Sequence, residues 1–208
     1  MDKKEIITWT FLGLSIIILS ATVYLYYFYR GDYLKLESKE FRNYTINGVD
    51  VHIDKDANQK RYVALIMAVK KEYIMGLKSI TVAKKVSVDG DKNGVGGYYE
   101  DGNIYIDMDE DEYGILYHEI GHHVMDYYNL DYCKLFHKMV EDAEESDMLG
   151  AGARFLGNTS VYLNYRFPSE YSLKTCGENF AVNFALWKME LPIYYEVENY
   201  FRDMVLKK

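Results

Sequence analysis

Three residues in one short stretch have the types and the spacing of a zinc site. His118, Glu119 and His122 form the pattern H-E-x-x-H. If the stretch is helical, the two histidines lie one turn apart on the same face, so both imidazoles can bind one zinc ion. Glu119 then lies beside the metal, where its carboxylate can take a proton from a water molecule that the zinc activates. The pattern therefore predicts a catalytic zinc on a helix.

The residues around the motif have the pattern of one amphipathic helix. An acidic run precedes it, in which Asp109 is a candidate N-cap and Glu112 completes a capping box. Apolar residues recur with helical spacing through the motif, and Asn129 is expected to end the helix. Gly121 leaves space beside the metal face. This context favours a zinc site over two unrelated histidines.

A catalytic zinc needs a third protein ligand and an open position for water. His137 is the only later histidine, and it lies in an ordinary helical pattern; the spacing H-E-x-x-H-x-x-G-x-x-H is absent. Among the carboxylates, Glu178 is favoured because it lies near the start of a helical segment among apolar residues, where an acid is costly unless it is paired or binds a metal. Glu170 and Glu190 are weaker candidates, and Glu178 as an ordinary surface charge stays an alternative.

Two residues close to the motif have candidate supporting roles. Asp126 follows His122 by one helical turn, and we expect it to accept the other ring N–H of that histidine. An ordinary surface aspartate has the same pattern and is the alternative. His123 faces away from the line of the two ligands and is interpreted as structural.

The rest of the chain predicts an α+β domain over residues 41–208, with a small mixed sheet followed by a mostly helical half. A hairpin is expected over residues 41–54, because Asn47-Gly48 is typical of a type I′ turn. Alternating or β-branched runs predict further strands at residues 79–83, 86–88 and 103–108. Apolar residues at helical spacing predict helices at residues 60–75, 131–148 and 175–189 and after Pro192. Residues 149–169 are expected to form a long loop that contributes to a substrate cleft.

The N-terminal segment has the composition of a membrane anchor. No charged residue occurs from Ile6 to Tyr29, and about 20 apolar residues span a bilayer. Trp9 lies near one end and four tyrosines near the other, as aromatic residues do at membrane interfaces. Residues 1–30 are therefore predicted to be a single-pass transmembrane helix, and residues 31–40 a linker. A cleaved signal peptide is the alternative. The short N-terminal tail favours a catalytic domain outside the cytoplasm.

Composition and charge exclude some classes of function. The 208 residues carry a formal net charge of −8, which is opposite to the basic face of a general nucleic-acid binder. Cys133 and Cys176 are the only cysteines. They do not make a disulfide framework, they do not fix the redox compartment, and they leave no C-x-x-C zinc site.

A second metal pattern lies at residues 89–100. Asp89, Asp91, Asn93 and Glu100 match the EF-hand loop pattern D-x-D-x-N-G-x5-E. An EF-hand needs a helix on either side of its loop, whereas the flanking residues here have strand patterns. A hairpin loop rich in Gly, Asp and Asn has the same composition. Calcium binding is therefore the disfavoured interpretation.

The motif and two later residues together resemble a peptidase family. HEIGH at residues 118–122, then Tyr171, then the E-x-F-A sequence that begins at Glu178 are similar to the gluzincin zinc peptidases of the anthrax lethal factor-like group, which includes the secreted Pro-Pro endopeptidases. The resemblance implies a zincin-like fold, Glu178 as the third zinc ligand and Tyr171 as the residue that stabilises the oxyanion. It also implies a Gly-Tyr-rich edge strand before the active-site helix, to which residues 96–99, followed by residues 102–106, are similar. Thermolysin-type gluzincins carry an acid four residues after the glutamate ligand, where this chain has Val182.

These expectations combine into a membrane-anchored zinc endopeptidase that acts on a peptide or protein substrate. The strand at residues 103–108, with Tyr105, is expected to hold an extended substrate by strand addition. A non-catalytic zincin-fold binding or regulatory protein at the membrane is the alternative, against which the intact Glu119 argues. An enzyme that faces the cytoplasm is a second alternative.

Overall fold

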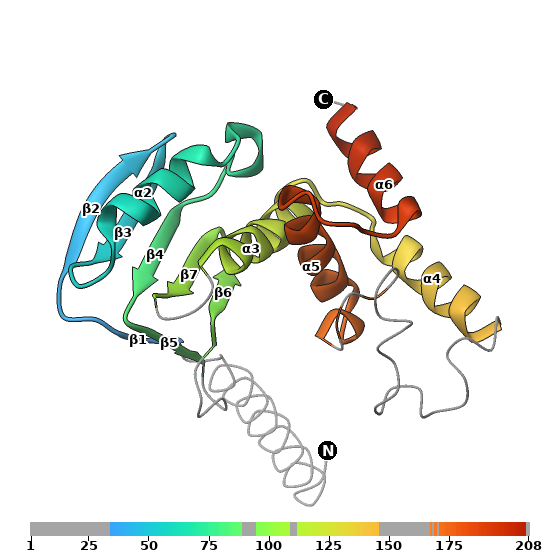
Figure 1. The fold of residues 1–208 in the computed structure, drawn as a ribbon, viewed down its shortest axis with the longest axis horizontal. Helices are drawn as coiled ribbons and strands as arrows, with labels where there is room; N and C mark the ends of the chain where they lie inside the picture. Colours follow the sequence, from blue (N-terminus) through green and yellow to red (C-terminus); the bar gives the residue numbers. More distant parts are fainter. Residues whose placement is uncertain are drawn as a thin grey trace, which may run out of the picture.

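The computed structural model describes residues 34–88, 95–108, 112–145, 167, 169 and 171–206. These residues form one five-stranded mixed sheet, a separate two-stranded sheet and a set of helices (Figure 1). The predicted α+β class with a small mixed sheet is confirmed. The predicted membrane anchor at residues 1–30 lies outside the described residues, and none of the described helices is long and apolar enough to cross a membrane.

The hairpin predicted around Asn47-Gly48 is present. β2 (Phe41–Ile46) and β3 (Val49–Asp54) pair antiparallel, with Ile46 opposite Val49. Asn47 has a φ of 53° and Gly48 a φ of 87°, the left-handed pair of conformations that a type I′ turn requires. The alternating burial of β3 places one face of the hairpin on the core.

The main sheet continues from β3 in the order β2-β3-β4-β7-β6. β4 (Ser79–Ala83) and β7 (Asn103–Asp107) run parallel to β3, and β6 (Gly97–Glu100) runs antiparallel to β7. The two central strands are rich in β-branched residues that are completely buried. β6 is paired on one side only among the described strands, so it is an edge strand.

Two regions differ from the sequence expectations. Leu34–Glu37, within the predicted linker, forms strand β1, which pairs with β5 (Lys85–Val88). The single helix predicted over residues 60–75 is instead α2 (Gln59–Ala68) followed by a 3₁₀ turn, Lys71–Tyr73. Val69 has an extended backbone, which ends α2 and lets Val69 and Tyr73 both reach the core.

The remaining helices pack beside the β6 end of the sheet. They are α3 (Glu112–Tyr127), α4 (Cys133–Glu145), the 3₁₀ turn η4 (Tyr171–Leu173), α5 (Cys176–Lys188) and α6 (Tyr195–Leu206). α3 contacts β6 and β7, and α5 packs across α3 on the side away from the sheet (Figure 1). The far face of α5 is buried through aromatic rings, including the edge-to-face pair of Phe180 and Phe201 at 5.2 Å between centroids. Burial on two sides fixes α5 against α3.

Candidate metal centre

α3 places His118 and His122 one turn apart on one face, as the spacing predicts. Their Nε2 atoms lie 3.2 Å apart. The two rings pack edge to face, with an interplanar angle of 85° and centroids 4.8 Å apart. Both side chains are about one-fifth exposed, at 17% and 21%. The pair is therefore shielded by protein but open toward one side.

α5 adds the third group. Oε2 of Glu178 lies 3.2 Å from His118 Nε2 and 3.3 Å from His122 Nε2, so the three atoms form a nearly equilateral triangle. A tetrahedral zinc ion binds nitrogen and oxygen at about 2.0–2.1 Å, which places its ligand atoms about 3.3–3.4 Å from one another. The triangle has this size. Among the described residues it is the only group of three or more His, Cys, Asp or Glu side chains with metal-site spacing.

The chemistry of the three atoms also fits a cation. Glu178 Oε2 is buried and has no hydrogen bond within the described structure. Two imidazole nitrogens and one carboxylate oxygen, all able to donate a lone pair, converge on one point. A buried acceptor without a partner is costly, and a metal ion at that point would satisfy all three atoms together.

The charges of the protein groups reinforce this fit. Burial disfavours the ionised form of Glu178, but the two facing histidines outweigh it and hold the pKa of that carboxyl well below its usual range. Burial likewise opposes protonation of His122, yet the carboxylates of Glu178 and Glu119 raise the pKa of its imidazole. The site thus stabilises positive charge, whether a proton or a metal ion carries it.

Glu119 differs from Glu178 in its surroundings. Its side chain is buried, with 5% exposure. Burial raises the pKa of Glu119 to about 7, although the nearby histidines act in the opposite direction. The edge strand covers it closely, because a Cβ at Gly97 would lie 2.6 Å from Glu119 Oε1. A carboxyl that gains and loses its proton near neutral pH suits a general base.

Tyr171 lies at the open side of the triangle, at the start of η4. Its hydroxyl donates a hydrogen bond of 3.1 Å to Glu178 Oε1, and its ring lies 5.8 Å from that of His118. Burial of the hydroxyl and the charge of Glu178 raise the pKa of Tyr171, so the group keeps its proton at neutral pH. The side chain is 44% exposed. The structure thus places a hydrogen-bond donor beside the three atoms of the triangle.

Two local features bring Glu178 to α3. The side chain of Thr175 caps α5 by accepting a hydrogen bond of 3.1 Å from the backbone N–H of Glu178. Farther along, a Cβ at Gly121 would lie 2.8 Å from the Cα of Ala181, so only glycine permits this crossing of α3 and α5. The space that Gly121 leaves is therefore filled by α5. The spacing Thr-x-x-Glu is a capping-box signal in the sequence.

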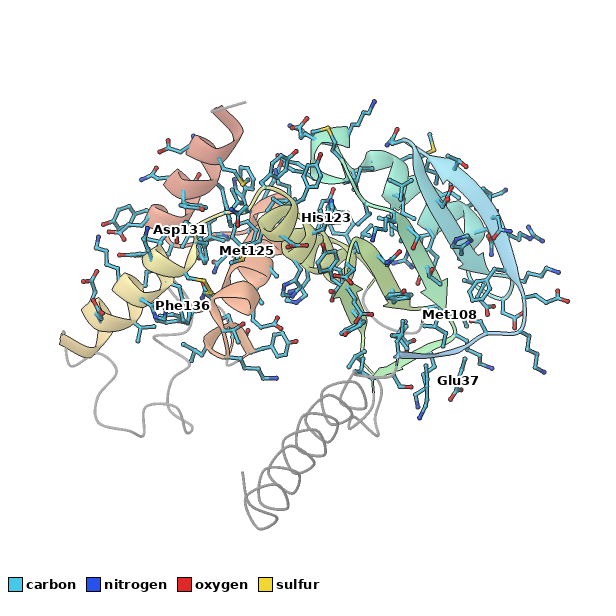
Figure 2. The ribbon with its side chains drawn as sticks, turned by 180° about the vertical axis from the view of Figure 1, so that it is seen from behind. Glu37, Met108, His123, Met125, Asp131 and Phe136 are labelled. Carbon is cyan, nitrogen blue, oxygen red and sulfur yellow. A yellow bond between two sulfur atoms is a disulfide. The ribbon has the colours of Figure 1, made fainter. Side chains whose placement is uncertain are left out.

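Asp126 and His123 have partners on the opposite side of α3 from α5. Asp126 Oδ2 accepts a hydrogen bond of 2.7 Å from the hydroxyl of Tyr99 on β6, not from His122. His123 is 2% exposed and its Nε2 lies 3.1 Å from the carbonyl oxygen of Met75 (Figure 2). The predicted structural role of His123 is in keeping with this contact, whereas Asp126 fastens the edge strand to α3.

A cavity of about 580 Å³ opens beside His118, Glu119 and Tyr171. Its wall is formed by the start of the edge strand, the first turns of α3 and the second half of α5: Val95, Gly96, Gly97, Gly114, Ile115, Val182, Ala185, Leu186 and Met189. Apart from the three site residues, the wall carries no charged side chain. The candidate site is thus polar at one end and apolar along its length.

The strand-addition role predicted for residues 103–108 and Tyr105 is wrong. β7 is hydrogen-bonded to β4 on one side and to β6 on the other, so it has no free edge. Tyr105 lies opposite Tyr98 in the β6–β7 pair, with the two rings 6.3 Å apart. Among the described strands it is β6 that has a free edge, and the start of β6 borders the cavity.

The disfavoured calcium site is largely outside the described part of the chain. Asp89, Asp91 and Asn93 lie there, and Glu100 ends β6. The described residues that flank the segment belong to strands β5 and β6, so the helices that an EF-hand needs are not present on either side.

Sequence reasoning missed one covalent bond. Cys133 and Cys176, the first residues of α4 and α5, form a disulfide with a sequence separation of 43. Two cysteines so far apart give no spacing signal, and only the packing of α4 beside α5 brings them together (Figure 2, where Phe136 marks α4). Cys176 lies two residues before Glu178.

Comparison of the chain with family models, with curated proteins and with solved structures found no match.

Proposed function

We propose that the chain is a zinc-dependent endopeptidase of the gluzincin type with a zincin-like fold. The observation that carries the proposal is the arrangement of Glu119 beside the triangle of His118, His122 and Glu178, at the end of an open cavity. A structural zinc site has four protein ligands and is closed, whereas a catalytic site has three and stays open. Three ligand groups and an adjacent basic carboxylate support the catalytic interpretation.

Each protein group then has a defined task. When bound, a zinc ion supplies polarisation of the scissile carbonyl and lowers the pKa of a water molecule to about 7. Glu119 takes a proton from the attacking water and delivers it to the leaving amine. Tyr171 donates its hydroxyl hydrogen to the carbonyl oxygen as negative charge develops there. The raised pKa of Tyr171 keeps that hydrogen available.

The substrate is proposed to be an extended peptide that pairs with β6. The free edge of β6 offers backbone hydrogen bonds, and Tyr99 holds this strand to α3 through Asp126. The leaving amine must lie beside Glu119, so the residue that follows the scissile bond enters the cavity. Because Ile115, Val182 and Leu186 line this cavity, we expect an apolar side chain there.

A membrane anchor at residues 1–30 and a catalytic domain outside the cytoplasm remain part of the proposal. The uncharged run from Ile6 to Tyr29 supports the anchor. The disulfide between Cys133 and Cys176 supports the location, because disulfides persist in oxidising compartments.

The test is cleavage of a peptide library by the purified full-length chain, together with its zinc content. We expect about one zinc per chain and cleavage before apolar residues. Glu119→Gln should keep the zinc and lose about 10²–10⁴-fold in kcat/KM. Glu141→Gln, which changes an exposed glutamate of α4, is the matched control and should cleave normally. A chain that binds zinc but cleaves nothing would support a non-catalytic binding protein instead.

A further inference from the structure

The first turn of α5, which carries Glu178, is held by α4 as well as by α3. The disulfide joins Cys176, the first residue of α5, to Cys133 at the start of α4. The residue before Cys133 makes a second contact, since the Tyr132 hydroxyl donates a hydrogen bond of 2.6 Å to Asn179 Oδ1. Tyr132 and Asn179 are both completely buried. The adjacent residues Tyr132 and Cys133 are therefore joined to α5 at two positions, Asn179 and Cys176.

These two positions lie on one face of α5, away from the metal ligands. Cys176 and Asn179 are three residues apart and so are neighbours on the helix surface. Glu178 and Ala181 are also three residues apart and face α3, where Ala181 packs on Gly121. The first turn of α5 is thus clamped between α3 and the start of α4.

The contacts at the first turn of α5 hold the carboxylate of Glu178 in the triangle. The ends of helices fray unless they are capped or docked, and here the cap is the single hydrogen bond to Thr175. Without the disulfide, the link between α4 and α5 would consist of non-covalent contacts such as that of Tyr132 with Asn179. The carboxylate of Glu178 must stay within about 0.5 Å of its position for the triangle to bind metal tightly.

We propose that the Cys133–Cys176 disulfide is a positioning pair for Glu178, so that its reduction weakens metal binding and cleavage while the domain stays folded. The proposal rests on the proposed function in taking Glu178 as a metal ligand. The reductant is a dithiol: one of its thiolates attacks a cysteine sulfur, and the other cysteine leaves as a thiolate. The second dithiol sulfur then attacks the mixed disulfide, which closes a cyclic disulfide and releases the first cysteine as a thiolate. Two electrons and two protons pass to the protein, which ends with two thiols.

The experiment compares the oxidised full-length chain with the Cys133→Ser/Cys176→Ser variant. Zinc affinity is measured by competition with a chelating dye, and cleavage at saturating zinc is measured in parallel. We expect the Kd for zinc to rise about 10–100-fold in the variant, the range seen when groups that orient metal ligands are removed. Wild type that is reduced with dithiothreitol and desalted without oxygen should match the variant. A Kd within twofold of oxidised wild type in a folded variant would overturn the proposal.

A double-mutant cycle separates positioning from general destabilisation. In a Glu178→Ala background the loss of the disulfide should change the zinc Kd by less than twofold, because the group that it positions is gone. A loss that persists in this background would overturn the proposal. Val51→Ala, a core truncation in β3 away from the site, is the stability control and should leave zinc affinity unchanged. Cobalt-loaded protein provides a spectroscopic check, since altered Glu178 ligation should shift its visible absorption.

The two proposals fail in different ways. If the oxidised wild-type chain binds no zinc and cleaves no peptide, the proposed function is wrong, and the positioning role of the disulfide falls with it. If the oxidised chain binds zinc and the cysteine variant binds it equally well, only the positioning role is wrong. If reduction weakens binding but the serine variant does not, the effect belongs to the free thiols and the positioning role is again wrong.

Discussion

α3 and α5 contribute to the same site in different ways. α3 supplies His118, Glu119 and His122 from a single stretch, so their relative placement follows from the repeat of the helix alone. α5 supplies only Glu178, and its placement depends on contacts with two other helices and on a cap. Local geometry therefore fixes the relative placement of His118, Glu119 and His122, while tertiary packing fixes the placement of Glu178.

Glu119 on α3 and Glu178 on α5 also differ in the direction in which the protein shifts their pKa. Both have an unperturbed pKa of 4.5. Burial raises the pKa of Glu119, whereas the histidines facing Glu178 lower the pKa of that carboxyl. Environments that separate the pKa values of two acids in this way are typical of sites in which one acid exchanges a proton and the other stays ionised. Under the proposed function, Glu119 on α3 can therefore exchange a proton near neutral pH while Glu178 on α5 stays negatively charged.

The largest expected effect comes from removal of the α5 ligand. Structural zinc sites have apparent binding free energies of about 10–16 kcal/mol, so the loss of one of three protein ligands is expected to cost about 4 kcal/mol, or about 10³-fold in Kd. Glu178→Ala should therefore weaken zinc binding as much as His118→Ala does. Titration with a competing chelator measures both. Unchanged affinity in Glu178→Ala would remove α5 from the site.

The second effect concerns the stability cost of Glu119. The folded pKa of Glu119 is about 7 and the unfolded value is 4.5, so folding binds a proton between these values. The cost is absent below pH 4.5, grows as pH rises and is complete above pH 7. In metal-free protein Glu119→Gln should raise the free energy of unfolding by about 3 kcal/mol at pH 8, since each pKa unit corresponds to about 1.4 kcal/mol.

Urea unfolding of both proteins in the presence of a chelator measures this difference. The difference should disappear at about pH 3, well below the unfolded pKa of 4.5, where Glu119 is protonated in both the folded and the unfolded chain. A gain of equal size at both pH values would mean that packing, rather than charge, is responsible.

The third effect tests the close approach of β6 to α3. Gly97→Ala introduces a Cβ 2.6 Å from Glu119 Oε1 and from Ile115 Cγ2, so either the strand or the base must move. A displacement of about 1 Å near a reacting group can lower the rate on the order of 10²-fold. We expect this loss in kcat with zinc content unchanged. Tyr98→Phe, on the face of β6 opposite Gly97, serves as control and should retain its rate.

The smallest effect compares two helix caps. Thr175 caps α5 and Asn58 caps α2, each through one side-chain hydrogen bond to the third residue of its helix. Replacing either residue by alanine should cost about 1 kcal/mol of stability. Only Thr175→Ala should also weaken zinc binding, because only that cap holds a metal ligand. Thermal unfolding and zinc titration of both variants make the comparison, and equal zinc affinities would mean that the cap does not position Glu178.

The sequence predicts those parts of the site whose geometry is determined by local structure. The i, i+4 histidines, the adjacent base and the Asn47-Gly48 turn all express short-range backbone geometry. The sequence also predicts Glu178, because an acid among apolar residues needs a partner and because the neighbouring residues resemble a known family.

The order of the strands in the sheet could not be predicted from local sequence patterns. Residues 97–100 and 103–107 form a tight hairpin, and the sequence does not state which of the two joins β4. The same limit applies to Asp126, whose partner Tyr99 comes from β6, and to the pairing of Cys133 with Cys176. Each of these relations depends on segments that are distant in the chain and meet only in the folded protein.

If the proposed function is correct, the dependence on Glu178 also sets the stage of synthesis at which the site can first form. His122 and Glu178 are 56 residues apart in the sequence, and α5 must cross α3 at Gly121 before the three ligand atoms meet. A chain still leaving the ribosome, with α3 already made, holds the whole H-E-x-x-H motif but not the complete ligand set. Under the proposed function, cleavage could therefore begin only after synthesis has passed α5 and this helix has docked on α3.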